Sequence, residues 1–110
     1  YPIATRKVKW DLAYRKKYGI EVEPPTDLSQ EVVRRIHSVC RRAYKALDLS
    51  GYARMDVRLK SDGQVFLIEA NPNPDIGFGE EFHKAAELGG LNYEDVISKV
   101  LNMGLSWSPG

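Results

Sequence analysis

Two carboxylates, Asp56 and Glu69, stand on either side of an Asp-Gly pair in a segment with the pattern of a β-hairpin. Asp-Gly between two apolar runs is typical of a two-residue type I′ turn, because that turn needs positive φ at both central residues. With Asp62 and Gly63 as the turn, Ser61 pairs with Gln64 and the pairing continues without interruption. This register places Asp56 directly opposite Glu69.

The same register sorts the hairpin side chains onto two faces, because side chains alternate along a strand. One face is predicted to be wholly apolar, with the cross-strand pairs Leu59–Phe66, Val57–Ile68 and Met55–Ala70. The other face is predicted to carry the pairs Arg54–Asn71, Asp56–Glu69 and Arg58–Leu67. Polar groups from both strands therefore converge on a single face.

The opposed carboxylates repel each other, by about 3 kcal/mol for two full charges about 5 Å apart at an effective dielectric constant of about 20. One interpretation is a surface ion network in which Arg54 and Arg58 neutralise the pair. The other is a divalent cation, since Mg²⁺ prefers oxygen ligands and takes few of them from the protein. Asn71 lies on the same side and can add a carbonyl oxygen. The hairpin alone leaves both interpretations open.

The run Asn71-Pro72-Asn73-Pro74 can end the second strand and also direct a ligand. Proline cannot donate to a strand ladder and asparagine favours turns. A proline after each asparagine also keeps that asparagine extended, which fixes its direction. An arginine beside two acidic metal ligands suits phosphoryl transfer, in which metal ions bridge phosphate oxygens and a guanidinium offsets developing charge.

Helices are predicted before and after the hairpin in the sequence, and the hairpin spans residues 52–71. Residues 29–48 form an amphipathic helix capped by Ser29, with an inward stripe of Val32, Ile36, Val39, Cys40, Ala43 and Leu47. Its arginine-rich outer face is interpreted as solvated rather than phosphate-binding. Residues 80–106 hold two further helices, with Asn92 capping the last one and an inward stripe of Val96, Ile97, Val100 and Leu101.

The first 25 residues fit a strand and a helix almost equally, and we expect an extended segment followed by a short helix from about Asp11 to Tyr18. The order helix, hairpin, helix, helix predicts an α+β fold in which helices cover one face of a small antiparallel sheet. At 110 residues the chain is at most one small domain.

Composition excludes several classes of protein. The net charge of +1 does not indicate a nucleic-acid partner, and no apolar run has the length of a membrane span. The single Cys40 cannot form an internal disulfide, so a reducing cytoplasm is the expected location. His37 and Cys40 could share a soft metal, but a core cysteine beside a flanking histidine is the preferred interpretation. His83 is expected to be a solvated helix residue.

The motifs Arg54-Met55-Asp56 and Glu69-Ala70-Asn71 resemble the R-x-D and E-x-N pair of the ATP-grasp ligases, in the D-alanine:D-alanine ligase-like branch. Weaker similarity extends upstream through Val8-Lys9-Trp10 and downstream through Gly89-Gly90. The resemblance therefore covers nearly the whole chain and implies the C-terminal subdomain of that fold.

The resemblance implies a role for each residue of these motifs. Asp56 would hold one Mg²⁺, Glu69 would bridge two, and Asn71 would hold the second, with ATP phosphates completing both shells and Mn²⁺ able to replace Mg²⁺. Arg54 would stabilise the transition state that forms an acylphosphate, and Lys9 would lie near the reacting groups. The implied activity joins a small-molecule carboxylate to an amine at the expense of ATP.

Two positions depart from the pattern of this branch: Asp75 replaces a glycine and Glu80 replaces a serine, so D-alanine is not the expected substrate. The other lobe of an ATP-grasp fold has no counterpart in residues 1–110. We therefore expect a partial domain that belongs to a longer ligase, needs a missing N-terminal lobe as its partner and is inactive alone. The alternative is a noncatalytic binding or assembly module, in which an exposed apolar seam pairs two copies as a homodimer.

Overall fold

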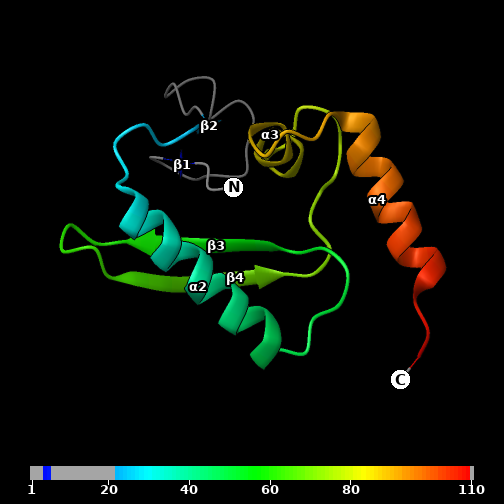
Figure 1. Ribbon diagram of the computed structural model, residues 1–110, viewed down its shortest axis with the longest axis horizontal. Coiled ribbons are helices and arrows are strands. Elements are labelled where there is room, and N and C mark those ends of the chain that lie inside the picture. The colour runs from blue at the N-terminus through cyan, green and yellow to red at the C-terminus, as the bar shows by residue number, and fades with distance from the viewer. Residues whose placement is uncertain (1–3, 6–21, 110) are drawn as a thin grey trace, which may run out of the picture.

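The computed structural model describes residues 4–5 and 22–109 (Figure 1). Two very short strands, β1 (Ala4–Thr5) and β2 (Val22–Glu23), pair antiparallel with each other. They are followed by α2 (Gln30–Ala46), β3 (Arg54–Leu59), β4 (Val65–Asn71), α3 (Glu81–Leu88) and α4 (Tyr93–Ser106). The predicted helix from Asp11 to Tyr18 and the candidate residue Lys9 lie outside the described residues. The α+β class is confirmed.

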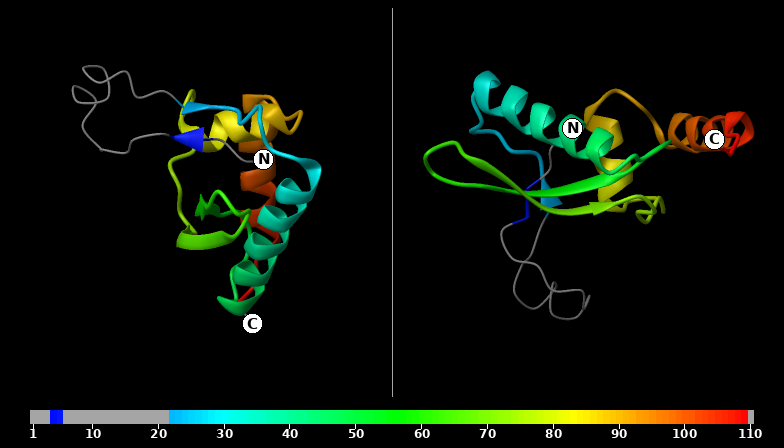
Figure 2. Two further views of the ribbon diagram at one scale, coloured as in Figure 1. Left: turned by 90° about the vertical axis from the view of Figure 1, so that its left-hand side faces the viewer. Right: turned by 90° about the horizontal axis from the view of Figure 1, so that it is seen from below.

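The helix α2 begins at the predicted cap. The Ser29 side chain accepts a hydrogen bond from the Val32 amide at 3.2 Å, which satisfies one of the free N–H groups of the first turn. Ile36 is the buried residue of this helix, and α2 packs along one side of the β3–β4 hairpin (Figure 2). Leu47, predicted to be inward, is 53% exposed because it follows the last helical residue.

The hairpin has the predicted register at one end only. Arg54 pairs with Asn71, Met55 with Ala70 and Asp56 with Glu69, as expected. Beyond an irregularity between Asp56 and Val57, the pairs become Val57–Leu67, Arg58–Phe66 and Leu59–Val65. Ile68 is thus an extra residue on β4, as in a β-bulge, where two residues of one strand oppose one of the other.

The turn differs from the predicted type I′. Lys60 and Gln64 pair through a hydrogen bond of 2.9 Å, and the Gly63 amide donates to the Lys60 carbonyl at 3.0 Å. Gly63 has φ of 82°, whereas Asp62 is not among the residues with positive φ and instead accepts the Gln64 amide through Oδ1 at 3.0 Å. The loop therefore has three residues with a left-handed glycine last, a common hairpin connection.

The bulge changes the composition of both hairpin faces. Phe66 now opposes Arg58 and is 49% exposed, and Ile68 in the bulge is 65% exposed. The predicted pairs Leu59–Phe66 and Val57–Ile68 of a wholly apolar face are therefore wrong. Leu67 takes the place opposite Val57, and Val57, Leu59 and Val65 are only half-buried.

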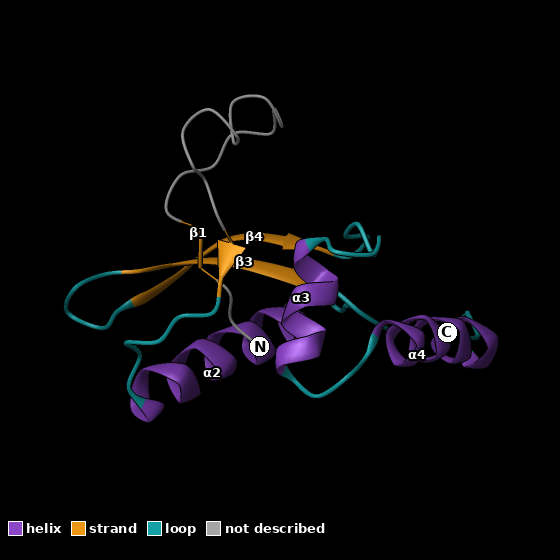
Figure 3. Ribbon diagram, turned by 90° about the horizontal axis from the view of Figure 1, so that it is seen from above, coloured by secondary structure: helices purple, strands orange, loops and turns teal. Residues whose placement is uncertain are grey.

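The two C-terminal helices contact each other, and α4 lies beyond the end of the hairpin remote from its turn (Figures 1 and 3). A capping box begins α4: Asn92 Oδ1 accepts the Asp95 amide at 2.8 Å and Asp95 Oδ2 accepts the Asn92 amide at 3.1 Å. Val96 is buried as predicted, but Ile97 and Leu101 are 38% and 60% exposed.

The buried core is small. Among residues 23–109, Ile36 and Val96 are the buried large apolar side chains, and His83 is the buried ionisable one. Large exposed apolar side chains are numerous by comparison and include Phe66, Ile68, Leu101 and Leu105. No helix in the described part of the chain has the length and apolar character needed to span a membrane.

Candidate metal and phosphate site

One face of the hairpin carries four of the predicted site residues. Antiparallel pairing sets Arg54 opposite Asn71 and Asp56 opposite Glu69, at adjacent positions on this face. Arg54, Asp56 and Asn71 are half-buried, whereas Glu69 is exposed. The structure therefore brings together the two carboxylates, the amide and the guanidinium that the sequence singled out.

The guanidinium of Arg54 binds both carboxylate oxygens of Asp56. Its Nε donates to Asp56 Oδ1 at 2.9 Å and its Nη2 donates to Oδ2 at 3.1 Å. The hydrogen bond to Asp56 raises the pKa of Arg54, and the charges of Asp56, Glu69 and Glu81 act in the same direction against the effect of burial. The guanidinium is thus a permanent cation amid three carboxylates.

The ion pair between Arg54 and Asp56 fits the interpretation in which arginines neutralise Asp56 and Glu69. Arg58 does not take part in this way. Arg58 is exposed and forms no ion pair with any other residue of the described chain. Within residues 22–109, no arginine forms a direct ion pair with Glu69. One unit of negative charge in the pair is therefore offset only at longer range.

Asn71 ends β4 and is held by its own backbone. Its Oδ1 accepts the Asn73 amide at 2.9 Å, the short-range turn that asparagine favours, and Pro74 is buried just beyond. The strand-ending role of this run is confirmed. A carbonyl oxygen has two lone pairs, so Asn71 Oδ1 retains one with which to bind a ligand.

The donor set fits Mg²⁺ better than a softer metal. Asp56, Glu69 and Asn71 supply only oxygen ligands, as hard cations prefer. Nowhere in the described residues do three or more histidine, cysteine or acidic side chains gather as a metal cluster. A cation here would keep most of its coordination shell for water and phosphate oxygens, which is typical of Mg²⁺.

The loop after Asn71 brings further groups toward the site. Asp75 Oδ1 accepts the Gly77 amide at 2.8 Å, and the Gly77 carbonyl accepts the Glu80 amide at 3.1 Å, where α3 begins. Glu81, the first residue of α3, is close enough for its charge to raise the pKa of Arg54. Sequence reasoning missed Glu81, although its place directly after the loop from Asn71 was the available signal.

The two histidines, His37 and His83, lie in different surroundings. The prediction that His83 is solvated is wrong, since it is 2% exposed. His37 and Cys40 belong to no metal cluster among the described residues, and burial raises the pKa of the Cys40 thiol.

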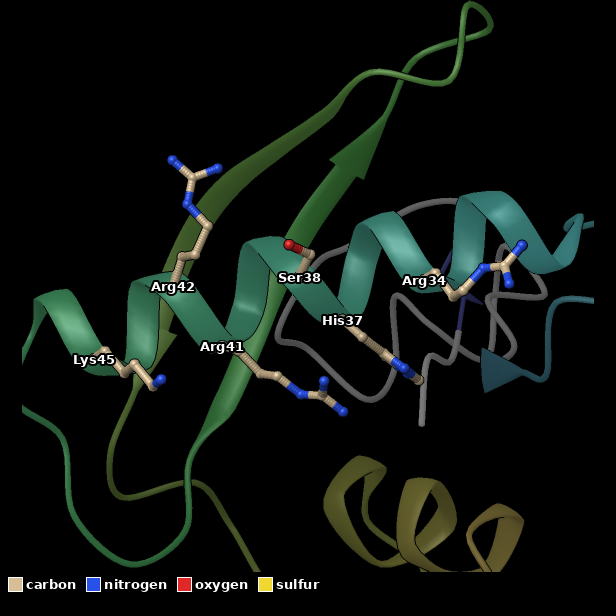
Figure 4. A pocket seen from close by; sticks show the side chains of 6 residues that line it. All are labelled: Arg34, His37, Ser38, Arg41, Arg42 and Lys45. Atoms are coloured by element: carbon tan, nitrogen blue, oxygen red, sulfur yellow. The ribbon is translucent and has the colours of Figure 1, made fainter.

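The basic face of α2 forms a shallow hollow of about 370 Å³, lined by Arg34, His37, Ser38, Arg41, Arg42 and Lys45. Figure 4 shows all six side chains projecting from α2 alone. Arg35 is instead paired with Glu31 at 3.0 Å and donates to the Gly63 carbonyl at 2.6 Å. This face shares no lining residue with the hairpin site.

The fold and the hairpin face define a class of protein: a small α+β unit that can present oxygen ligands and one fixed cation to a metal-bound phosphate. A family model described as D-ala D-ala ligase C-terminus matches residues 4–102, and the chain belongs to that family. It is accordingly the C-terminal portion of an ATP-grasp fold of the D-alanine:D-alanine ligase-like branch.

Curated relatives carry the name of this family. The D-alanine–D-alanine ligase of Shouchella clausii (strain KSM-K16) is 32% identical over 96 residues, which are 87% of this chain and 26% of that protein. The D-alanine–D-alanine ligase of Cupriavidus pinatubonensis is 38% identical over 77 residues, 70% of this chain and 24% of that protein. The D-alanine–D-alanine ligase A of Chromobacterium violaceum is 31% identical over 96 residues, with 87% and 26% covered. The chain thus spans about a quarter of the length of these relatives.

Proposed function

We propose that this chain supplies the Mg²⁺-ATP phosphate site of an ATP-dependent carboxylate:amine ligase. The observation that carries the proposal is the hairpin pairing of Asp56 with Glu69, next to the pair of Arg54 with Asn71. The D-alanine–D-alanine ligases among its relatives support a ligase, and the oxygen-only donor set supports Mg²⁺. We also propose Lys9 as an ATP-binding residue.

Each residue of the site has a specific task in the proposed reaction. Asp56, Glu69 and Asn71 would hold two Mg²⁺ ions, with Glu69 as the ligand shared between them. The bound ions would neutralise charge on the ATP phosphates. Arg54 offsets the charge that develops on the transferred phosphoryl group, because its guanidinium is fixed beside the ligands and stays protonated. Before a cation binds, Asp56 keeps this guanidinium in place through the two hydrogen bonds.

The proposed chemistry has two steps. An oxygen of the carboxylate substrate attacks the γ-phosphorus of ATP, the bond to the β-phosphate oxygen breaks, and ADP leaves. The amine nitrogen then attacks the acyl carbon, inorganic phosphate leaves and the nitrogen loses a proton. Asp75 and Glu80 lie on the loop that follows Asn71 and add negative charge there. This charge would repel an amine substrate that keeps a free carboxylate, as D-alanine does, so we expect a different amine substrate.

The partner in this proposal is the N-terminal lobe of a longer protein, and residues 1–110 are a partial domain of it. The small buried core and the exposed apolar side chains Phe66, Ile68, Leu101 and Leu105 support this view, since they leave apolar surface for another lobe to cover. A homodimeric binding module would use the same surface, and it is distinguished by a lack of ADP release.

The test is ATP-dependent ADP release by the full-length protein with Mg²⁺ and a panel of carboxylates and amines. Glu69→Gln removes the bridging charge with little change of shape and is expected to lower the rate by about 100-fold or more. Glu94→Gln, the same change on the exposed first turn of α4, is the matched control and should leave the rate unaltered. Full activity of Glu69→Gln would overturn the metal assignment.

A further inference from the structure

His83 is the most deeply buried ionisable side chain among residues 23–109, with 2% of its surface exposed. Its Nδ1 accepts a hydrogen bond from the Gly79 amide at 2.8 Å. A neutral imidazole has one donor and one acceptor nitrogen, so acceptance at Nδ1 leaves the proton on Nε2. That Nε2 is buried without a hydrogen-bond partner in the described structure and lies 3.4 Å from Glu87 Oε1.

Aromatic rings hold the imidazole in this orientation. The Phe78 ring lies 4.9 Å from the His83 ring and the Tyr93 ring lies 5.0 Å from it, between centroids. Phe78 and Tyr93 also contact each other edge to face at 5.4 Å. Since Phe78 belongs to the loop, His83 to α3 and Tyr93 to the start of α4, the three rings join three consecutive segments.

The hydrogen bond from the Gly79 amide to His83, here called the tether, lies next to the proposed site. The loop of residues 72–80 follows Asn71 and leads to α3, whose first residue, Glu81, acts electrostatically on Arg54. Asp75 makes an internal bond with the Gly77 amide, so it shapes the loop without attaching it to α3. Gly79 has φ of 83°, a left-handed conformation that glycine adopts without strain, and its amide is tied directly to an α3 side chain.

We propose that His83 is a positioning residue, which holds the Gly79 amide through Nδ1 and thereby fixes the loop of residues 72–80 and Glu81 beside Arg54. The proposal rests on the proposed function for its catalytic consequence, whereas the tether itself is independent of it. His83 touches neither ATP nor the reacting groups. It acts through the loop that joins the proposed ligand Asn71 to α3.

The tether is tested first without any activity measurement, by NMR of the ¹⁵N-labelled full-length protein. In the neutral imidazole of His83 we expect the proton on Nε2 and none on Nδ1. His83→Leu removes the acceptor and should raise hydrogen exchange at the Gly79 amide by about 5- to 10-fold. His83→Asn keeps an acceptor oxygen near the position of Nδ1 and should restore most of the protection.

Val96→Ala is the control for a general loss of packing, because Val96 is 3% exposed and carries no polar group. If Val96→Ala raised Gly79 exchange as much as His83→Leu, or if His83→Asn gave no rescue, His83 would be a packing residue only and the proposal would fail. A proton on Nδ1 in the wild-type protein would also overturn it.

The catalytic consequence is tested by steady-state ADP release. His83→Leu should raise KM for the carboxylate or amine substrate by about 10-fold and change KM for ATP less, since the residues proposed to bind the ATP phosphates lie on β3 and β4 and not on the loop. His83→Asn should recover most of the change. Equal effects on all three KM values would count against loop positioning. An inactive wild-type protein would refute the proposed function, while the NMR results would still decide the tether.

Discussion

The Arg54 guanidinium and the Asp56 carboxylate, two residues apart on β3, are joined by two hydrogen bonds of 2.9 and 3.1 Å that engage both carboxylate oxygens. Glu69, opposite Asp56, has no such arginine partner within residues 22–109. Arginine and a divalent cation would therefore compete for the same oxygens of Asp56. The ion network and the proposed metal site would then be two states of one cluster of side chains.

This competition predicts that removal of Arg54 strengthens cation binding while it abolishes activity. In Arg54→Ala, both Asp56 oxygens become free and the local positive charge disappears. We expect Mn²⁺, used as the probe, to bind about 3- to 10-fold more tightly without ATP, which corresponds to about 1 kcal/mol of lost competition. Electron paramagnetic resonance of free Mn²⁺ in the full-length protein measures this affinity.

Arg58→Ala is the matched control for the Arg54 change, because Arg58 lies further along the same strand and makes no ion pair within the described chain. It should alter Mn²⁺ affinity by less than about twofold. Weaker Mn²⁺ binding in Arg54→Ala would mean that the two groups do not share Asp56.

The predicted opposition of Asp56 and Glu69 is confirmed, although the route to it was partly wrong. The Asp62-Gly63 pair predicted a two-residue turn, whereas the actual three-residue loop shifts the pairs from Leu59–Val65 to Val57–Leu67 by one position. The extra residue Ile68 then shifts the pairing back before Glu69. A turn signal is local and a bulge depends on the packing of both strands, so the sequence could predict the first and not the second.

The helices and their caps could be predicted because they depend on local signals. Ser29 and Asn92 cap the helices that they were expected to begin. Burial could not be predicted as well, because it depends on tertiary contacts. His83 is buried by the rings of Phe78 and Tyr93, and Leu101 stays exposed because only one face of α4 meets α3.

The left-handed conformation of Gly63 in the hairpin loop leads us to expect that a larger residue there destabilises the fold. Its φ of 82° is unfavourable for any other residue except asparagine or aspartate, and an added Cβ would lie 2.9 Å from Arg35 Nη1. Gly63→Ala should lower the free energy of unfolding by about 1 kcal/mol or more. Urea denaturation of the full-length protein, followed by a probe in this domain, measures the change.

Gly104→Ala provides the opposite result as a control. Gly104 lies inside α4 with no atom within 4 Å of an added Cβ, and alanine is the better helix former by about 1 kcal/mol. This variant should be as stable as the wild type or more stable. Equal destabilisation by both substitutions would contradict the assignment of a left-handed loop residue at position 63.

The partial burial of Cys40 leads us to expect slow reaction with alkylating reagents. The thiolate is the nucleophile, and burial raises the pKa of this thiol, so the thiolate fraction at pH 8 is smaller than that of a free cysteine. Iodoacetamide should modify Cys40 several-fold more slowly in the native protein than in urea. The difference should narrow as the pH rises above the ordinary thiol pKa of about 8.5, because the unfolded thiol is then already ionised. A native rate equal to the unfolded rate at pH 8 would show that Cys40 is accessible and ordinary in its ionisation.

The capping box at the start of α4 predicts that Asn92 stabilises the contact between α3 and α4. Asn92→Ala leaves the Asp95 amide without its 2.8 Å acceptor and should cost about 1 kcal/mol of unfolding free energy. Asn92→Ser keeps a side-chain acceptor and should cost only a few tenths of that amount, about 0.3 kcal/mol. Because Tyr93 follows the cap and packs on His83, the alanine change should also increase hydrogen exchange at the Gly79 amide, whereas the serine change should not. An Asn92→Ala variant with wild-type exchange at Gly79 would mean that the start of α4 is not needed to hold the imidazole in place.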